Sequence, residues 1–407
     1  MKKIFQNIGP SALIAAAFIG PGTITVCSIS GITFGYDLLW ALAFSILATL
    51  VLQEMSARLG LVTGKDLAGL IRIYFSSPWK KILALILVIV SIVLGNAAYE
   101  AGNITGAVLG LNAVFKPDES SAFYSEFNLF PIAIGLFALI VLALDSYKKI
   151  EKVLVFLVIL MSLSFVLSAV LISPDWIGIL KGIFVPSFPE NSLTSILAIV
   201  GTTVVPYNLF LHSAIVQEKW NSPKAIQYAR WDILIAIGLG GVVSMAVIIT
   251  GAALHENGIA STDFSNFAES LTPLYGKYAS FLLGFGFFAA GITSTITAAL
   301  AAAYVLKSCL NWSGNSGKLY FKLVWVGIIL SGVFFSSLGI KPLELIQTAQ
   351  ISNAIVLPFA AIFLFIIVNN KKWMGEYKNN IWQSALGLLI LIFTLFLGVK
   401  SLFQFFT

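Results

Sequence analysis

The chain has 407 residues, of which 24 are Lys or Arg and 18 are Asp or Glu, so its net charge is +6 at pH 7. Only 10% of the residues are charged, 58% are hydrophobic, and the mean hydropathy is +0.95. A soluble globular domain carries about 25% charged residues, so this composition excludes a chain of several soluble domains. The basic residues form no cluster with interleaved aromatic side chains, which argues against nucleic acid as a partner. The composition predicts a multi-pass membrane protein.

Hydropathy predicts about eleven all-helical membrane spans joined by short connections. The predicted spans are residues 10–34, 37–59, 80–112, 129–146, 151–173, 192–218, 231–254, 274–308, 320–338, 343–368 and 382–403. No connection is long enough for a separate soluble domain. The expected location is the plasma membrane of a bacterial-type cell.

The distribution of Lys and Arg predicts the orientation of these spans. With the N-terminus inside, 19 of the 24 basic residues lie on the inner side, and five remain outside: Lys116, Lys181, Lys277, Lys341 and Lys400. Basic residues accumulate in the inner loops of membrane proteins. The pattern therefore predicts an inner N-terminus and an outer C-terminus.

Two predicted spans contain residues that interrupt a helix. The first span carries Gly20-Pro21-Gly22-Thr23, and the sixth carries Val205-Pro206-Tyr207-Asn208. Proline removes a backbone donor and clashes with the preceding turn. Interrupted helices in corresponding positions of two halves are typical of inverted-repeat transporters, whose substrate site lies near the bilayer midplane. The expected division is a first repeat in residues 1–173, a second in 192–368, and an extra span in 382–403.

Several segments resemble the NRAMP family of divalent-metal transporters. The stretch from Gly201 to Ser213 is similar to that family's Met-Pro-His-Asn region and its Leu-His-Ser continuation. The run from Ala289 to Thr297 resembles its Ala-Ala-Gly-Gln-Ser-Ser-Thr segment. The resemblance implies a LeuT-like fold of five plus five helices in inverted repeats, followed by one extra helix. It also implies secondary transport by alternating access.

The sequence departs from the family where the family binds metal. The first-span motif of the family is Asp-Pro-Gly-Asn, and the residues that match its Asp and Asn are Gly20 and Thr23. In the sixth span, Val205 stands where the family has a Met ligand, and Thr202 stands where an Ala carbonyl serves as ligand. Tyr207 replaces the His that follows the proline. The side-chain metal ligands that the family supplies are therefore absent, and the metal-ligand set stays unknown.

The remaining candidates for substrate binding are neutral groups around the two interruptions. Hard divalent cations prefer oxygen ligands that include a carboxylate, and a Met sulfur favours softer transition metals. With neither present, we expect a divalent cation to bind with poor selectivity for transition metals. The candidate binding residues are Gly20, Gly22, Thr23, Thr202, Thr203, Val205, Tyr207 and Asn208.

The same interruptions leave two alternatives open. Helix N-termini after Gly22 and Pro206 carry partial positive charge and free amide donors. Without an acid at the first interruption, they favour an anion or the carboxylate of a zwitterion, so a carrier of a small organic or anionic solute is the first alternative. The second alternative is a receptor or scaffold that does not transport.

One acid lies deep inside a predicted span. An ionised side chain at the bilayer centre costs about 2.5–3.5 kcal/mol on insertion scales, so Glu100 is expected to face the protein interior. We interpret Glu100 and His212 as candidate relays for protons or cations, with packing roles as the alternative. Candidate path-lining residues are Asn96, Asn103, Gln350 and Asn353.

The sequence thus predicts a secondary transporter and not an enzyme, since it shows no nucleophile–base pair, phosphate loop or metal-ligand cluster. No cofactor is expected. The expected partners are the lipid bilayer, a small-molecule or ion substrate, and protons as a candidate coupling ion. The oligomeric state stays open.

Overall fold

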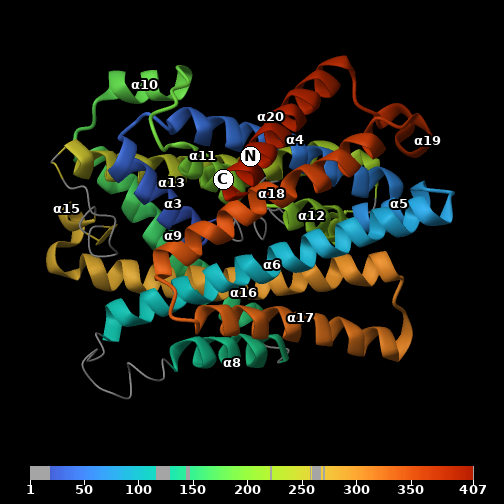
Figure 1. The fold of residues 1–407 in the computed structure, drawn as a ribbon, viewed down its shortest axis with the longest axis horizontal. Helices are drawn as coiled ribbons and strands as arrows, with labels where there is room; N and C mark the ends of the chain where they lie inside the picture. Colours follow the sequence, from blue (N-terminus) through green and yellow to red (C-terminus); the bar gives the residue numbers. More distant parts are fainter. Residues whose placement is uncertain are drawn as a thin grey trace.

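The computed structural model of the chain describes residues 19–115, 129–143, 147–220, 222–256, 258, 267–268 and 271–406. All regular structure in these residues is helical (Figure 1). Eight helical segments are long and apolar enough to cross a bilayer, a bent pair supplies a ninth, and two shorter apolar helices complete the series among the described residues. This series matches the predicted all-helical membrane fold.

The helices follow the predicted spans in chain order. They are α3 (Pro21–Phe34), α4 (Leu39–Thr63), α6 (Pro78–Phe115), α8 (Phe130–Ala143), α9 (Tyr147–Leu171), α11 (Leu193–Thr203) with α12 (Pro206–Lys219), α13 (Ile226–Glu256), α16 (Ala279–Leu310), α17 (Gly314–Ser336), α18 (Pro342–Val368) and α20 (Ile381–Phe406). Residues 10–18 of the first predicted span lie outside the described residues.

Short helices occupy the connections, and hydropathy did not predict them because they are too short to span a bilayer. Asp66 begins α5 (Leu67–Tyr74), where its carboxylate accepts a hydrogen bond from the N–H of Gly69 at 2.7 Å. Asp175 begins α10 (Trp176–Phe184) in the same way. Because α10 is bent by 118° from the end of α9, it cannot continue that span. The remaining short elements are α15 (Thr272–Tyr275), α19 (Lys371–Met374), η1 (Pro223–Ala225), η2 (Gly276–Tyr278) and η3 (Gly375–Tyr377).

Both predicted interruptions appear as helix starts. Gly20 is extended (φ −100°, ψ 179°) and α3 begins at Pro21. In the sixth span α11 ends at Thr203, Val205 is extended (φ −79°, ψ 120°), and α12 begins at Pro206. A proline in the first turn gives up no hydrogen bond that a helix would otherwise make. The prolines therefore set where these helices begin.

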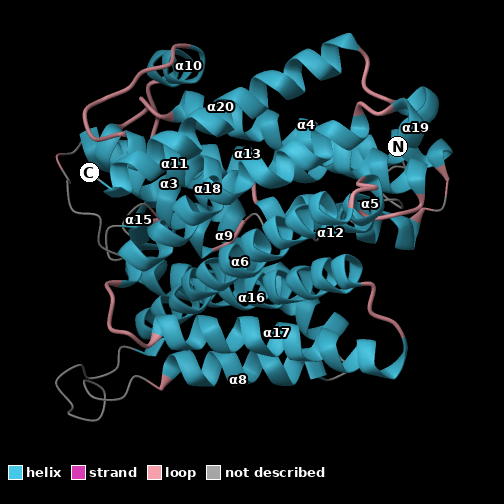
Figure 2. Ribbon diagram, turned by 45° about the vertical axis from the view of Figure 1, so that its right-hand side comes forward, coloured by secondary structure: helices cyan, strands magenta, loops and turns pink. Residues whose placement is uncertain are grey.

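The helices are arranged in layers, which the two ribbon views show from different sides (Figures 1 and 2). The long helices α6 and α16 run side by side through the middle, where the Asn96 amide donates to the carbonyl of Ala298 at 2.8 Å. On one side α17 and then α8 cover this pair. On the other side lie α3, α4, α11, α13 and α18, with α10 and α20 beyond them.

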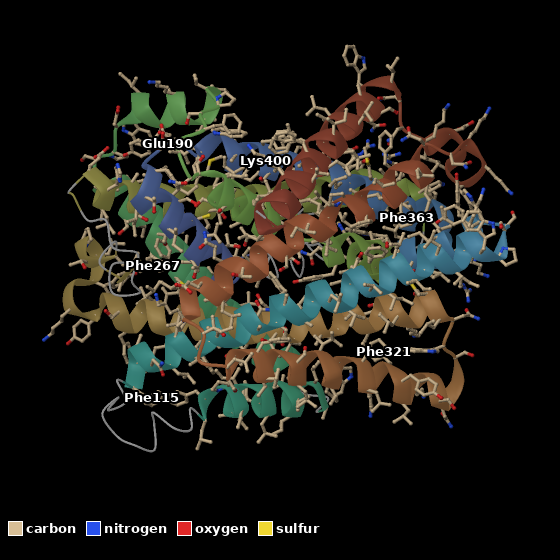
Figure 3. All side chains as sticks on the ribbon, in the orientation of Figure 1. Phe115, Glu190, Phe267, Phe321, Phe363 and Lys400 are labelled. Atoms are coloured by element: carbon tan, nitrogen blue, oxygen red, sulfur yellow. The ribbon has the colours of Figure 1, made fainter. Side chains whose placement is uncertain are left out.

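Side chains fill the spaces between these layers (Figure 3). Phe321 of α17 packs edge-on against Tyr304 of α16, with ring centroids 5.3 Å apart. Large apolar side chains also remain exposed on the outer helices: Leu136, Leu163, Phe334 and Ile392 are between 55% and 61% exposed. An apolar surface of this kind suits a lipid environment.

Candidate functional site

The start of α3 packs against the end of α11. Thr23, in the first turn of α3, shares a hydrogen bond of 2.8 Å with the hydroxyl of Thr202. Both threonines are buried. No side chain caps the start of α3, where Gly20 is the N-cap residue. The structure thus brings together Gly20, Thr23 and Thr202, which lie about 180 positions apart in the chain.

The start of α12 faces the same region. Tyr207, in the first turn of α12, contacts Tyr99 of α6 edge to face, with ring centroids 5.6 Å apart. The hydroxyl of Tyr99 in turn lies 3.7 Å from the position that a Cβ atom on Gly20 would take. No side chain caps α12, because its N-cap residue is Val205. Tyr99 therefore connects the two helix starts.

Two polar side chains from other helices approach the glycines of the first interruption. Ser294 of α16 places its hydroxyl oxygen 2.8 Å from the Cβ position of Gly20. Gln350 of α18 places its amide carbon 2.7 Å from the Cβ position of Gly22. A side chain at either glycine would displace these groups, so the glycines allow a close approach that other residues prevent.

Several polar atoms at this site have no hydrogen-bond partner within the described residues. They are the hydroxyl of Ser294, both amide atoms of Gln350, the side-chain oxygen of Asn208 and the side-chain nitrogen of Asn353, and all four residues are at most 2% exposed. A buried polar group without a partner costs about 1–3 kcal/mol. Ser294, Gln350 and Asn208 lie at the two helix starts, which is the arrangement expected of a site that receives a polar ligand.

Two of the predicted binding residues, Thr203 and Val205, offer no free polar side chain to a ligand in this conformation. The hydroxyl of Thr203 donates to the carbonyl of Ile199 at 2.7 Å, and its own carbonyl accepts from Thr49 of α4 at 3.0 Å. Val205 is buried and contributes no polar side chain. These two residues therefore shape the interruption through their backbone.

Glu100 is fully buried in α6, and one of its carboxylate oxygens accepts from the Asn103 amide at 3.3 Å. Gly332 of α17 packs so closely that a Cβ atom there would lie 3.0 Å from the Glu100 carbonyl carbon. Glu100 thus lies on the side of α6 that faces α17, whereas Tyr99 faces the helix starts. The other predicted polar residue of α6, Asn96, is engaged with α16 as described above.

His212 is fully buried in α12, and its Nδ1 lies 2.8 Å from the side-chain oxygen of Gln53 in α4. Among the described residues, no group of three or more His, Cys, Asp and Glu is close enough together to hold a metal ion. The described part of the interruption is therefore built from hydroxyls, amides and backbone groups.

Tyr99 and Ser294 are site residues that the sequence did not reveal. Ser294 belongs to the eighth-span run whose resemblance was recognised, and Tyr99 is the neighbour of Glu100, so both lay within segments already noted. Neither residue type is unusual in an apolar helix. Only the packing of α6 and α16 against α3 reveals their position.

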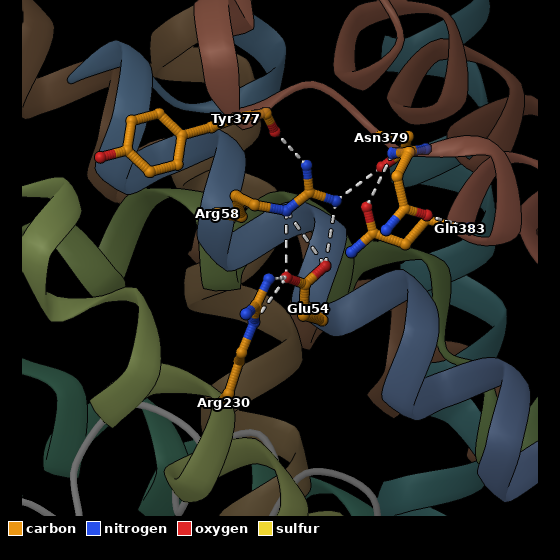
Figure 4. A network of polar contacts seen from close by, with 7 residues as sticks. Glu54, Arg58, Arg230, Tyr377, Asn379 and Gln383 are labelled. Carbon is orange, nitrogen blue, oxygen red and sulfur yellow. Dashed lines mark hydrogen bonds and ion pairs between the residues drawn. The ribbon is translucent and has the colours of Figure 1, made fainter.

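A second polar cluster ties α4 to α13 and to the segment after α19 (Figure 4). Glu54 contacts Arg58 at 3.0 Å and Arg230 at 2.8 Å. Arg58, only 3% exposed, also donates to the Tyr377 carbonyl and, at 2.6 Å, to Asn379. The distribution of Lys and Arg predicts an inner location for all of these segments, so we expect the cluster to join three inner segments.

Replacing Glu54 with Gln should destabilise the protein, because it removes the negative charge between two arginines. Glu54 is 19% exposed and Arg230 is 43% exposed, so the expected cost is that of hydrogen bonds to charged groups, about 1.5–3 kcal/mol. Urea or thermal unfolding of the purified protein in detergent measures the change. Glu344→Gln is the control, because the 3.2 Å pair of Glu344 with Lys341 is 62% and 81% exposed and should change stability by less than about 0.5 kcal/mol. Equal losses in the two variants would contradict a structural role for Glu54.

Comparisons with known proteins agree with this architecture. A bacterial protein from Caldanaerobacter subterraneus subsp. tengcongensis, called divalent metal cation transporter MntH, is 28% identical over 98% of this chain and 93% of its own. The protein of the same name from Staphylococcus haemolyticus is 30% identical over 96% and 90%.

Solved structures show the same fold. The manganese transporter of Eremococcus coleocola, in complex with an aromatic bis-isothiourea substituted compound, superimposes with a TM-score of 0.78 at 24% identity, over 98% of this chain and 86% of the other. MhsT in complex with L-phenylalanine gives 0.59 at 16% identity, over 97% of each chain. The LeuT-like architecture expected from the resemblance is confirmed. Residues 11–404 match the family model described as "Nramp: Natural resistance-associated macrophage protein-like", and the chain belongs to this family.

Proposed function

We propose that this protein is a multi-pass secondary transporter, not an enzyme, that moves a divalent cation across the membrane by alternating access. Its relatives are named divalent metal cation transporters, and they cover nearly the whole chain. The single observation that carries the location of the site is the convergence of buried, unpartnered polar atoms on the starts of α3 and α12. Alternating access would open this region in turn to the two sides, with residues 1–173 and 192–368 as the two repeats.

The proposed selectivity follows from the ligand types. Thr23, Thr202 and Asn208 offer neutral oxygens, and Gln350 adds an amide oxygen from α18. Such oxygens suit hard cations, and no sulfur is present among them to favour a softer metal. The transporter should therefore accept magnesium, calcium and manganese without a strong preference for manganese.

Uptake into proteoliposomes tests this proposal. The purified protein should take up Mn²⁺, Mg²⁺ and Ca²⁺ with efficiencies that lie within about tenfold of one another, and protein-free liposomes should take up none. Absence of uptake for all three ions would overturn the proposed function. A preference for Mn²⁺ by several orders of magnitude would retain the function and overturn the selectivity.

Glu100 and His212 are the proposed relays for a coupling proton. Support comes from their full burial inside the protein, Glu100 in α6 beside Asn103 and His212 in α12 beside Gln53 of α4. Uptake by the wild-type protein is expected to increase with an inward proton gradient, and Glu100→Gln, which cannot release a proton, should lose that increase. An unchanged response of the Glu100→Gln variant to the gradient would remove Glu100 from the proton path.

A further inference from the structure

We propose that the transported cation binds together with a small monovalent anion, which replaces the carboxylate that the first interruption lacks. This inference rests on the proposed function, because it concerns the ligand set of the same site. The anion class comprises halides and small carboxylates, which share one negative charge and accept hydrogen bonds. Its place is beside Gly20 and Gly22, at the start of α3.

The two helix starts together create a positive electrostatic potential. Both α3 and α12 are 14 residues long, and both begin without a side-chain cap. The first N–H groups of a helix have no partner within it, and the helix start carries about half a positive charge. Tyr99 contacts both starts, so the two partial charges act on the same region. A divalent cation placed there adds to this positive potential and needs negative charge nearby.

Glu100 lies off the face of α6 that meets the start of α3, although its charge acts on Tyr207 at the start of α12. Glu100 packs against Gly332 of α17 and accepts from Asn103 of its own helix. Tyr99 and Gly106, seven residues apart on one face of α6, are the residues that meet α3: Gly106 lies against Pro21 and Tyr99 against Gly20. Seven residues are nearly two full turns, so Glu100 is displaced from that face by about 100° of helix rotation.

The buried polar groups without partners include hydrogen-bond donors as well as acceptors. The Gln350 amide nitrogen is a donor only, which an anion satisfies and a cation does not, and the Ser294 hydroxyl can donate as well. The Gln350 amide oxygen, which also has no partner in the described residues, is left for the cation. Ser294 and Gln350 are at most 1% exposed, and both lie against the glycines of the interruption. The Asn208 oxygen is an acceptor and suits the cation. Donors beside α3 and an acceptor in α12 form a site for an ion pair.

The two glycines let hydrogen-bond donors approach the start of α3, because Ser294 and Gln350 occupy the places where Cβ atoms would stand. A carboxylate side chain at position 20 would occupy the space beside Ser294, where its Cβ would already lie 2.8 Å from the hydroxyl oxygen. With glycine there, the negative charge has to come from solution. An anion that neutralises the helix starts would increase the affinity for the cation, and by linkage the cation would increase the affinity for the anion to the same extent.

The test measures Mn²⁺ uptake by the full-length protein in proteoliposomes prepared in chloride, in acetate or in gluconate, an anion much bulkier than the proposed class. The affinity for Mn²⁺ should be at least about tenfold higher with a small anion than in gluconate. An advantage in chloride alone identifies a halide, an advantage in acetate alone a carboxylate, and either outcome supports the proposal. Equal uptake in all three media would overturn it and leave the proposed function intact, whereas absence of uptake in every medium would overturn the proposed function itself.

Matched variants locate the anion. Gly20→Asp supplies a fixed carboxylate, so its Mn²⁺ uptake should no longer depend on the anion, while Gly20→Asn has the same shape without the charge and should retain the dependence. Anion dependence that survives in Gly20→Asp would contradict the proposed place. If the added side chain prevents folding, chloride binding to the wild-type protein decides instead, since Mg²⁺ should increase it. Chloride binding that is unchanged by Mg²⁺ would contradict the ion pair.

Discussion

Replacing Gly251 with Leu is expected to abolish the folded transporter. Gly251 of α13 faces α3, where a Cβ atom would lie 2.9 Å from the Ser28 carbonyl oxygen and 3.1 Å from the Cα of Gly31. These neighbours are backbone atoms, so they cannot move aside as a side chain would. Overpacking typically costs 1–3 kcal/mol and occasionally more, and a leucine against backbone should cost at least about 3 kcal/mol. Because α3 also carries Thr23, the same displacement would disrupt the site.

The same helix supplies the control for this prediction. Gly238 has no atom within 4 Å of its Cβ position, and leucine favours helix over glycine by about 1 kcal/mol. Gly238→Leu should therefore be folded and as stable as the wild type or more so. Size-exclusion profiles and thermal unfolding in detergent distinguish the two variants. Equal profiles and equal unfolding midpoints would show that α3 and α13 do not pack in this way.

Replacing Gln350 with Leu is expected to reduce cation uptake by about tenfold or more. A tenfold loss corresponds to about 1.4 kcal/mol of binding free energy, which is what we expect one ligand to contribute. The same change should leave stability equal or increase it, because the buried Gln350 amide has no partner in the described residues and an unpartnered group costs about 1–3 kcal/mol. A residue that contacts the substrate should show lower uptake with equal or higher stability, whereas a residue that only holds helices together should show a loss of both. Uptake is measured in proteoliposomes and stability by unfolding of the same preparation.

The control is Gln347→Leu, one turn earlier in α18, where the glutamine is only half-buried. This variant should retain uptake within about twofold, since substitutions away from a site change free energies by less than about 0.5 kcal/mol. If Gln350→Leu destabilises the protein as much as it reduces uptake, Gln350 holds helices together and does not contact the substrate.

The spans were predictable because the length of each apolar segment can be read from the sequence alone. The predicted span 343–368 corresponds to α18 at Pro342–Val368, and 80–112 corresponds to the longer α6 at Pro78–Phe115. The interruptions were also predictable, since proline and glycine act locally on the backbone. The short helices α5 and α10 were not predicted, because hydropathy identifies only segments long enough to cross the bilayer.

The composition of the site was only partly predictable, because it depends on contacts between distant segments. Thr23 and Thr202 could be paired through the two interruptions, and the structure joins them by a hydrogen bond. Ser294 could not be placed, since its approach to Gly20 depends on how α16 packs against α3. Periodicity gives little help in helices that are apolar on nearly every face.

The cluster around Glu54 also depends on contacts between segments that are far apart in the chain. Residues four apart share one face of a helix, so the spacing of Glu54 and Arg58 alone suggests their pair, which the structure has at 3.0 Å. The further contacts with Arg230 and Asn379 join segments more than 170 and 320 positions away in the chain. Local spacing contains no information about such contacts.

The central claim is that a divalent cation binds between the starts of α3 and α12 with neutral protein ligands. Anomalous scattering from crystals of the protein grown with Mn²⁺ measures this most directly, because it locates the ion independently of the surrounding density. The predicted result is one Mn²⁺ ion in contact with oxygens of Thr23, Thr202, Asn208 or Gln350. An ion bound at Glu100, or only on the protein surface, would contradict the claim.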